Sequence, residues 1–386
     1  MEQLQAKLAI LAERLFEGQG WQNDRAVLIE NGRIHAVVPY DEIPQGFVEQ
    51  RLPAGSSLAP GFIDLQANGG GGLLLNDAPT AYAMRAIARA HRRFGTTALL
   101  PTLITDTREK TISAIAAARE AAEEEGVLGL HLEGPFLNPA RAGVHRKSHI
   151  AQAQMTDLEW LGSLADCGHS IITLAPECVP PGFIAALTAR GIRVCAGHSE
   201  ATAEQMRAAM AEGLTGVTHL FNAMPPFAGR APGIVGTALA ESRITAGIIV
   251  DGLHVDPVSI RAAFAAKGAN RIALVTDAMP SVGAAIDRFE LMGTNISLQN
   301  GRLLTDDGAL AGAHLDMASA LRNAVELAHI PLENALTAAT HTPARFLGIE
   351  KERGAIVPGA RADLVALRGD LQVLATWIDG VREERH

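Results

Sequence analysis

Four polar residues each follow a short apolar run of the chain. Glu133 ends the run 127–132, His198 ends 192–197, His219 follows 216–218, and Asp277 ends 272–276. If these runs are parallel strands, their carboxyl ends lie together and the four side chains meet. One carboxylate and two imidazoles are a zinc ligand set that leaves a position for water. We therefore predict a hydrolytic metal site with Glu133, His198 and His219 as ligands and Asp277 as the catalytic proton carrier.

Each of these residues has a structural alternative when it is taken alone. A lone buried histidine is more often a hydrogen-bonded core residue than a ligand, and a lone aspartate at a strand end often caps a helix. The joint pattern favours a site, because four unrelated core residues would not all need to stand at the same ends of the strands.

A second metal is not expected. Gln66 and Asn68 are two residues apart in the first predicted strand, so they share a face where two histidines would bind a further ion. Amides are poor ligands for a transition metal, and none of the five lysines ends a strand, which argues against a bridging modified lysine. We predict one divalent ion per subunit: zinc, with iron, manganese or cobalt as alternatives. His131 faces the same way as Glu133 and either supports the site or packs in the barrel interior.

Several residues after the strands could contact an anionic substrate. Asn222 and Ala223 follow the sixth strand, where free N–H groups bind anions. Arg230 lies in a glycine-rich loop, His254 follows the seventh strand and His145 the third. For Arg230 and His145, a solvated loop position is the alternative interpretation.

The middle of the chain alternates short apolar runs with Ala-rich helical segments. Eight such runs predict a (β/α)8 TIM barrel, class α/β, rather than an open doubly wound sheet, because the polar residues are spread over the whole set of strands. No dinucleotide-binding glycine pattern follows the first run. The predicted strands are 61–65, 96–101, 127–132, 171–174, 192–196, 216–219, 246–250 and 272–275, and the clearest helices are 80–94, 106–125 and 201–212, with Asp106 and Asp256 as N-caps.

Both ends of the chain read as short strands. An Asn31-Gly32 turn joins 25–30 to 33–38, and 354–359, 363–367 and 373–378 are strand-like. Neither end could bury a core alone. We predict a small β-sandwich domain from 1–58 plus 350–386 and a catalytic barrel at 59–349. The stretch 280–312 reads as a hairpin insertion, followed by helices near 316–328 and 332–347.

Composition excludes several classes of protein. The chain has 386 residues, 48% of them hydrophobic, and a net charge of −9, so it is globular and an unlikely nucleic-acid partner. An anionic substrate would need a local cationic pocket. Three cysteines in no recognisable pattern fit a reducing cytoplasm. We expect a cytoplasmic protein, with no signal peptide and no membrane-spanning run.

The chain resembles the amidohydrolase superfamily, and within it closely resembles the N-acetylglucosamine-6-phosphate deacetylase family. The resemblance lies in 60–69, 131–136, 196–199, 218–224, 251–254, 275–279 and 354–364, and it covers nearly the whole chain. It implies metal-dependent removal of the N-acetyl group of N-acetyl-D-glucosamine 6-phosphate, in amino-sugar catabolism, by a homodimer. It also implies that the sugar phosphate is contacted by Val144, His145, Asn222, Ala223, Arg230, His254, Leu310, Ala311 and Gly312, with part of the phosphate site lent by the neighbouring subunit. Ala231 departs from the family pattern, in which an acidic residue often follows the arginine.

Three alternatives to this function remain at this stage. The substrate could be the galactosamine epimer, since one hydroxyl is read by detailed pocket geometry. An inactive amidohydrolase-like scaffold should have lost one of the four strand-end residues, and this chain keeps all four. A hydrolase of cyclic amides usually has the two-metal site, so the number of bound ions would discriminate it.

Overall fold

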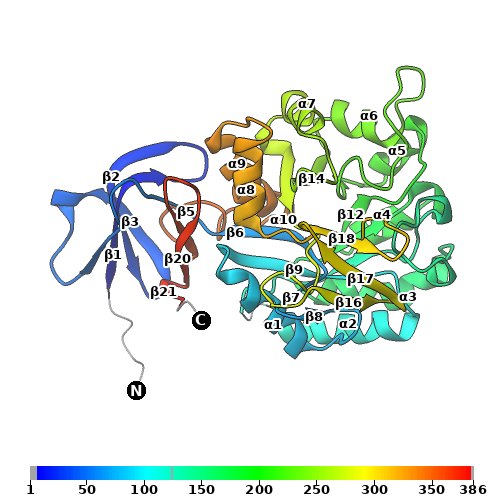
Figure 1. Cartoon of the computed structure of the whole chain (residues 1–386), viewed down its shortest axis with the longest axis horizontal. Helices are drawn as coiled ribbons and strands as arrows, with labels where there is room; N and C mark the ends of the chain where they lie inside the picture. The colour runs from blue at the N-terminus through cyan, green and yellow to red at the C-terminus, as the bar shows by residue number, and fades with distance from the viewer. Residues whose placement is uncertain (1–6, 123–124, 384–386) are drawn as a thin grey trace.

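The computed structural model describes residues 7–122 and 125–383 of the chain. A large α/β barrel and a smaller β domain lie side by side (Figure 1). The small domain contains the strands at both ends of the chain, β1 (Leu8–Phe16) and β21 (Val381–Arg382). The predicted arrangement, a barrel with a β domain built from both termini, is therefore confirmed. The predicted boundaries at 58/59 and 349/350 stay a prediction.

Eight parallel strands form the barrel, as predicted from the alternating pattern. They are β6 (Phe62–Ala67), β9 (Thr96–Ile104), β10 (His131–Glu133), β11 (Ile171–Leu174), β12 (Arg193–Ala196), β13 (Gly216–Val217), β14 (Thr245–Ile249) and β15 (Ile272–Val275). Each pairs with the next in this order. No ladder joins the described parts of β15 and β6. That seam is closed by a parallel bridge between Ala67 and Ala278 and by the amide of Asp277, which donates to Gln66 O at 2.9 Å.

The helices are α1 (Ala81–Arg92), α2 (Arg108–Ala121), α3 (Leu158–Leu161), α4 (Phe183–Thr188), α5 (Ala203–Ala211), α6 (Gly233–Ala240), α7 (Pro257–Lys267), α8 (Met317–Glu326), α9 (Leu332–Ala339) and α10 (His341–Leu347). In α1 the buried Met84, Ile87, Ala88 and His91 recur at helical spacing and form one buried face. Asp256 caps α7 as predicted, accepting from Val258 N at 2.8 Å.

Two helix predictions were wrong in detail. Thr107, not Asp106, caps α2. The Asp106 carboxylate instead accepts hydrogen bonds from Lys110 Nζ at 3.1 Å and from Asn76 Nδ2 at 3.1 Å. The predicted helix 332–347 is two helices. It breaks at Thr340, whose φ of −130° and ψ of −75° are not helical, and α10 follows as a separate helix.

The β domain is one branched sheet. It comprises β1, β2 (Trp21–Glu30), β3 (Arg33–Pro39), β4 (Val48–Arg51), β5 (Ser57–Pro60), β19 (Leu364–Leu367), β20 (Val373–Ile378) and β21. Along one edge β1 pairs with β2, and along the other it pairs first with β4 and then with β5. One apolar cluster includes Ile10, Leu58 and Trp377, and a second includes Leu11 and Leu28. The predicted strand 354–359 is wrong: this segment is turns, with Gly354 and Gly359 at φ of 81° and 88°.

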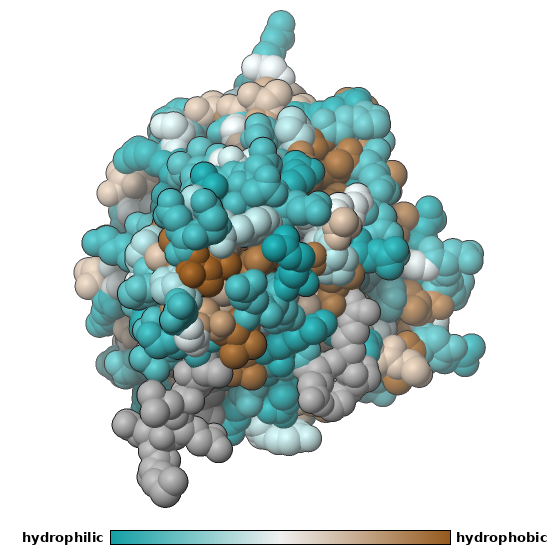
Figure 2. Space-filling model, turned by 90° about the vertical axis from the view of Figure 1, so that its left-hand side faces the viewer, coloured by the Kyte–Doolittle hydropathy of each residue, from teal (hydrophilic) through white to brown (hydrophobic). Residues whose placement is uncertain are grey.

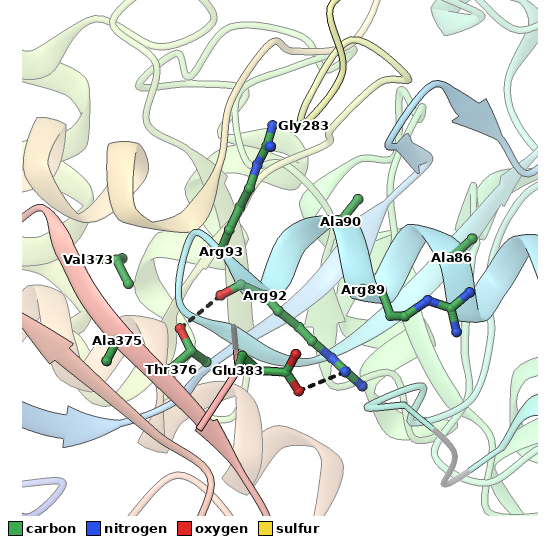
Figure 3. Close-up of a pocket in the computed structure, with 10 residues that line it drawn as sticks. All are labelled: Ala86, Arg89, Ala90, Arg92, Arg93, Gly283, Val373, Ala375, Thr376 and Glu383. Carbon is green, nitrogen blue, oxygen red and sulfur yellow. Dashed lines mark hydrogen bonds and ion pairs between the residues drawn. The ribbon is translucent and has the colours of Figure 1, made fainter. Parts of the chain in front are cut away.

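Arg92 joins the two domains. Its Nη1 donates to Glu383 Oε1 at 2.9 Å, and its carbonyl accepts from Thr376 Oγ1 at 2.8 Å. Figure 3 shows both contacts at the edge of a cavity of about 380 Å³ between α1 and the C-terminal strands. Because this guanidinium is almost fully buried and also pairs with Glu125, the domains are tied by more than apolar packing.

The insertion after the last barrel strand has one strand more than a hairpin. β16 (Arg288–Leu291), β17 (Thr294–Gln299) and β18 (Arg302–Thr305) form an antiparallel sheet. Asn300 and Gly301 form the turn between β17 and β18, with φ of 51° and 78°, and a type I′ turn requires such positive values at both residues. A short hairpin of β7 (Gly69–Gly70) and β8 (Leu73–Leu74) follows β6.

The face at the β-domain end is largely hydrophilic, with small separate hydrophobic patches (Figure 2). Among the described residues, no helix combines the length and the apolar character that crossing a bilayer requires.

Candidate active site

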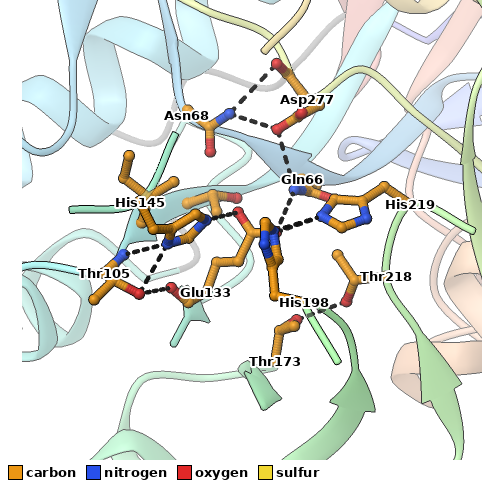
Figure 4. Close-up of polar contacts among 12 residues, drawn as sticks. Gln66, Asn68, Thr105, Glu133, His145, Thr173, His198, Thr218, His219 and Asp277 are labelled. Atoms are coloured by element: carbon orange, nitrogen blue, oxygen red, sulfur yellow. Dashed lines mark hydrogen bonds and ion pairs between the residues drawn. The ribbon is translucent and has the colours of Figure 1, made fainter. Parts of the chain in front are cut away.

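Glu133, His198 and His219 converge at the carboxyl ends of β10, β12 and β13. His219 Nε2 lies 2.8 Å from Glu133 Oε1, and His198 Nε2 lies 3.3 Å from the same oxygen. The two imidazole nitrogens are 3.0 Å apart, and all three side chains are buried (Figure 4). The three predicted ligands are thus brought together in one group whose donor atoms lie within 4.8 Å of one another.

The hydrogen bonds behind these rings suit a metal ion. His198 Nδ1 lies 2.7 Å from the carbonyl oxygen of Arg141, which can only accept. The proton of neutral His198 is therefore on Nδ1, and the lone pair of Nε2 faces His219 and Glu133. Two nitrogens and a carboxylate oxygen this close need a shared proton or a cation between them. They could hold a zinc ion, whose bonds to such atoms are about 2.0–2.2 Å.

Electrostatics within the group are strongly coupled. Burial alone would raise the pKa of Glu133, but the imidazoles of His198 and His219 beside its carboxylate hold it well below its usual value. The reverse holds for His219, whose pKa is raised because the hydrogen bond and charge of Glu133 outweigh its burial. The Glu133 carboxylate is therefore ionised, which a ligand to a divalent cation must be.

Asp277 stands beside this group, two residues after β15. Its Oδ1 accepts from Asn68 Nδ2 at 2.6 Å and from Gln66 Nε2 at 3.1 Å. The same Gln66 nitrogen donates to Glu133 Oε1 at 3.2 Å, so one amide links the two carboxylates (Figure 4). Burial, and then the charge of Glu133, raise the pKa of Asp277 to about 6. A carboxylate poised near neutrality can both accept and return a proton.

Three of the four strand-end residues have left-handed backbones. The φ values are 47° at His198, 32° at His219 and 50° at Asp277. Such values are uncommon outside glycine and concentrate at functional sites, because the surrounding structure must hold them. They turn the chain sharply after each strand while the side chain stays over the barrel mouth.

Gln66, Asn68 and His131 take the roles expected of neighbours rather than ligands. Both amides donate to carboxylates, and their buried carbonyl oxygens have no hydrogen-bond partner among the described residues. His131 is bonded to Leu65 O at 2.9 Å and to Thr173 Oγ1 at 2.7 Å, and burial lowers its pKa to about 4. A neutral histidine held in this way matches the packed barrel-interior alternative.

His145 lies closer to the metal group than its loop position indicated. Its Nε2 is 3.7 Å from Glu133 Oε2, its ring centroid is 4.3 Å from that of His198, and Thr105 Oγ1 lies 2.8 Å from its Nδ1. Burial, and then the charge of His198, lower its pKa to about 3. The solvated-loop alternative is excluded for His145. Val144 packs with the apolar cluster that contains Met279.

The other predicted substrate contacts differ in how close they lie to the site. The amide of Asn222 donates to His219 O at 2.9 Å, and Ala223 follows with φ of 52°. His254 Nδ1 is 2.6 Å from Asp251 Oδ2, and its charge acts on Asp277. Arg230 lies on an exposed loop and makes no ion pair with a described residue.

The segment Leu310, Ala311 and Gly312 runs past Asp277. Ala313 N donates to Asp277 O at 3.0 Å, and Ala311 N donates to Leu303 O in β18 at 3.1 Å. Gly312 has φ of 63°, and a Cβ there would lie 2.4 Å from Met279. The insertion therefore contributes the wall next to Asp277.

Sequence reasoning missed several supporting residues. Three of them hydrogen-bond to residues at the site: Asp64 to Thr276, Thr105 to His145, and Asp251 to His254. A signal existed for two of them: Asp64 is two residues before Gln66 and so shares its face, and Asp251 is three residues before His254. Nothing in the sequence links Thr105 to His145 or the Arg141 carbonyl to His198.

Comparison with known proteins agrees with this geometry. The model of the amidohydrolase family matches residues 57–382. An N-acetylgalactosamine-6-phosphate deacetylase of Shewanella sp. (strain ANA-3) is 44% identical over 333 residues, 86% of this chain and 84% of the relative. An N-acetylglucosamine-6-phosphate deacetylase of Haemophilus influenzae is 35% identical over 370 residues, 94% of this chain and 95% of the relative.

Solved structures extend the match to the fold. The crystal structure of N-acetylglucosamine-6-phosphate deacetylase from Pasteurella multocida superposes with a TM-score of 0.94 at 34% identity, and the match covers 98% of this chain and all of that one. Since both the family model and full-length relatives match, the chain belongs to the amidohydrolase family, in the group that includes the N-acetylglucosamine- and N-acetylgalactosamine-6-phosphate deacetylases.

Proposed function

We propose that this protein removes the N-acetyl group of N-acetyl-D-glucosamine 6-phosphate by hydrolysis, giving D-glucosamine 6-phosphate and acetate. One observation carries the proposal: two imidazoles and a carboxylate converge within 4.8 Å, and Asp277 is linked to the same carboxylate through Gln66. The relatives named above bear the names of deacetylases of this substrate or its epimer.

We assign Glu133, His198 and His219 as ligands of one divalent ion, zinc by the chemistry of the donor set. A zinc ion there would supply a Lewis acid for the amide carbonyl and would lower the pKa of water. The Gln66 and Asn68 amides support a single ion, because both donate to carboxylates of the site and an amide is a poor ligand for a transition metal.

Asp277 moves the proton in this proposal. Both amides donate to its Oδ1, so Oδ2 is the oxygen available to carry a proton. As a carboxylate it takes a proton from the attacking water. As an acid it gives that proton to the amine nitrogen when the C–N bond breaks.

Substrate binding is assigned to the residues around this centre. These residues follow the barrel strands or lie in the insertion after β15: Asn222 and Ala223 after β13, His254 after β14, Val144 and His145 after β10, and 310–312 in the insertion. Arg230 supplies positive charge for the phosphate, which the net charge of −9 makes necessary. Its exposed loop fits a homodimer in which the phosphate site is shared, and light scattering of the purified enzyme measures that state.

Replacement of Asp277 by Asn tests the proposal. Metal content should stay at one ion per chain, while kcat for acetate release should fall by a factor of about 10²–10⁴, the usual contribution of a general acid–base group. Asp256→Asn is the matched control, because asparagine caps a helix as well as aspartate does. Activity of Asp277→Asn close to that of the unmodified enzyme would refute the assignment.

The galactosamine epimer is the second candidate substrate. The observation that favours it is the 44% identity with a relative named for that substrate. Comparison of kcat/KM for the two epimeric sugar phosphates decides between them, and their unphosphorylated forms measure how much the phosphate contributes.

A further inference from the structure

A cluster of four arginines lies at the opposite end of the barrel from the candidate active site. Arg193 begins β12, Arg243 and Arg271 precede β14 and β15, and Arg345 lies in α10. All four line one cavity of about 570 Å³, a size typical of small-molecule sites. The candidate active site is at the carboxyl ends of the same strands, so this basic pocket is separate from it.

The charges of the basic pocket are not balanced by ion pairs. Arg193 Nε and Arg345 Nη2 donate to the main-chain carbonyls of Phe346 and Asn270, not to carboxylates. None of the four arginines makes an ion pair with any residue in the described ranges. The charge of the Glu350 carboxylate acts on both Arg193 and Arg345, and its buried Oε2 has no hydrogen-bond partner in residues 7–122 and 125–383.

The arginines also oppose one another. Burial lowers the pKa of Arg345, and the charge of Arg271 lowers it further. Burial likewise lowers the pKa of Arg193. Like charges gathered at a partly desolvated site cost stability unless an anion compensates them. In a chain with a net charge of −9, such a cluster is not explained by a general excess of basic residues.

The shape and chemistry of the cavity indicate the kind of anion. The hydroxyl residues Thr188, Thr215 and Thr245 and the backbone of Gly191 and Gly213 complete its lining. Guanidinium groups with hydroxyls around them match the several acceptor oxygens of a phosphate group. A recess lined on several sides fits a small molecule better than an extended strand of nucleic acid.

We propose that this basic pocket, formed by Arg193, Arg243, Arg271 and Arg345, binds a small molecule that carries a phosphate group. Two sources share that chemistry, inorganic phosphate and a sugar phosphate such as glucosamine 6-phosphate. The site faces Phe346, which also lines the small cavity in the barrel core below Gln66 and Thr218.

Isothermal titration of the metal-loaded enzyme tests the site, with inorganic phosphate in one arm and glucosamine 6-phosphate in the other. The Arg243→Gln/Arg271→Gln variant removes two charges from the rim. For at least one of the two ligands, one component of the binding isotherm should weaken in this variant. The affinity of that component should fall by about tenfold or more, as expected for lost charge-assisted hydrogen bonds. The Arg207→Gln/Arg261→Gln variant, which changes two exposed arginines on α5 and α7, is the matched control and should keep that component.

Three further results decide the outcome. Because Arg230 does not line the basic pocket, Arg230→Gln should leave the component that depends on Arg243 and Arg271 intact. Unfolding midpoints measured without ligand show whether the double variant is folded, and Arg243→Gln alone replaces it if it is not. Identical isotherms for the basic-pocket variant and the unmodified enzyme in both arms would overturn the proposal.

Discussion

The carboxylate of Asp64 accepts hydrogen bonds from both the main chain and the side chain of Thr276. Thr276 N lies 3.2 Å from Oδ1 and Thr276 Oγ1 lies 2.5 Å from Oδ2, deep in the protein. Asp64 is in the first barrel strand and Thr276 follows the last, so this contact adds to the bridge and the main-chain hydrogen bond that close the seam between them. Since Thr276 directly precedes Asp277, the contact also positions the proposed proton carrier.

Replacement of Thr276 by Val should therefore damage both stability and catalysis. The isosteric change leaves Asp64 with one donor fewer in a buried site, which costs about 1–3 kcal/mol of unfolding free energy. Because Asp277 loses its neighbour's anchor, kcat should fall more than KM changes. Chemical denaturation and steady-state kinetics measure the two effects. Thr276→Ser keeps the hydroxyl, so its unfolding free energy and its kcat should both stay close to those of the unmodified enzyme. Equal losses of stability and activity in the Val and Ser variants would contradict this role.

Asp64 should also make stability depend on pH. Burial raises its pKa to about 7 from an ordinary 3.8. Between these values the folded protein binds a proton that the unfolded chain does not, so stability contributed by this group is full below pH 4 and falls as pH rises through 7. An asparagine in place of Asp64 would not titrate. Its amide can donate to Thr276 Oγ1, which can itself donate to Gln66 O at 3.2 Å.

The Asp64→Asn variant isolates that contribution. The unfolding free energy of the variant minus that of the unmodified enzyme should rise by roughly 2–3 kcal/mol from pH 5 to pH 8, because only the unmodified enzyme loses stability as Asp64 ionises. Denaturant unfolding of both metal-loaded proteins at the two pH values gives the difference. A constant difference across this range would mean that Asp64 is already ionised at pH 5.

The strand-end pattern predicted the centre of the site, whereas the supporting contacts could not be predicted. Strand ends in a parallel barrel are fixed by topology, so Glu133, His198, His219 and Asp277 could be placed together from their positions alone. His145 could not, because its location beside Glu133 depends on the path of a loop. The break at Thr340 was equally hidden, since no glycine lies within 332–347 and the one proline, Pro343, follows the break.

Gln66 should be needed for turnover but not for metal binding. Gln66→Leu removes the amide that donates to both Glu133 and Asp277, and these two carboxylates then face each other without a shared donor. We expect kcat to fall by about tenfold, the loss typical of a buried hydrogen bond to a charged group. Metal analysis should still give one ion per chain. Loss of the metal together with activity would instead make Gln66 part of the metal site.

Removal of the metal should destabilise the protein. Glu133, His198 and His219 are buried together, so a bound ion stabilises the folded state by its binding free energy, about 4 kcal/mol when free metal is a thousand times its Kd. Chelation should lower the unfolding midpoint, and added zinc should restore it. Glu133→Gln weakens the ligand set, so its midpoint should respond less to both treatments. If chelation left the unfolding midpoint of the unmodified enzyme unchanged, that result would count against a metal bound by these three residues.

A side chain at Gly216, in the barrel interior, should destabilise the protein because of the close neighbours of this residue. A Cβ at Gly216 would lie 2.2 Å from Cys195 Sγ and 2.9 Å from Phe346 Cζ, whereas a Cβ at Gly247, in the next strand, would meet nothing closer than 3.4 Å. Gly216→Ala should therefore cost about 1–3 kcal/mol by overpacking, and Gly247→Ala should cost less.

A double variant separates this steric explanation from a loss of backbone freedom. Cys195→Ala removes the sulfur atom nearest the new methyl group, so Gly216→Ala/Cys195→Ala should be less destabilised than the sum of the two single changes. Denaturant unfolding of the four proteins in this cycle gives the coupling energy. Additive losses would mean that the cost of Gly216→Ala arises from contact with Phe346 or from the backbone, and not from Cys195.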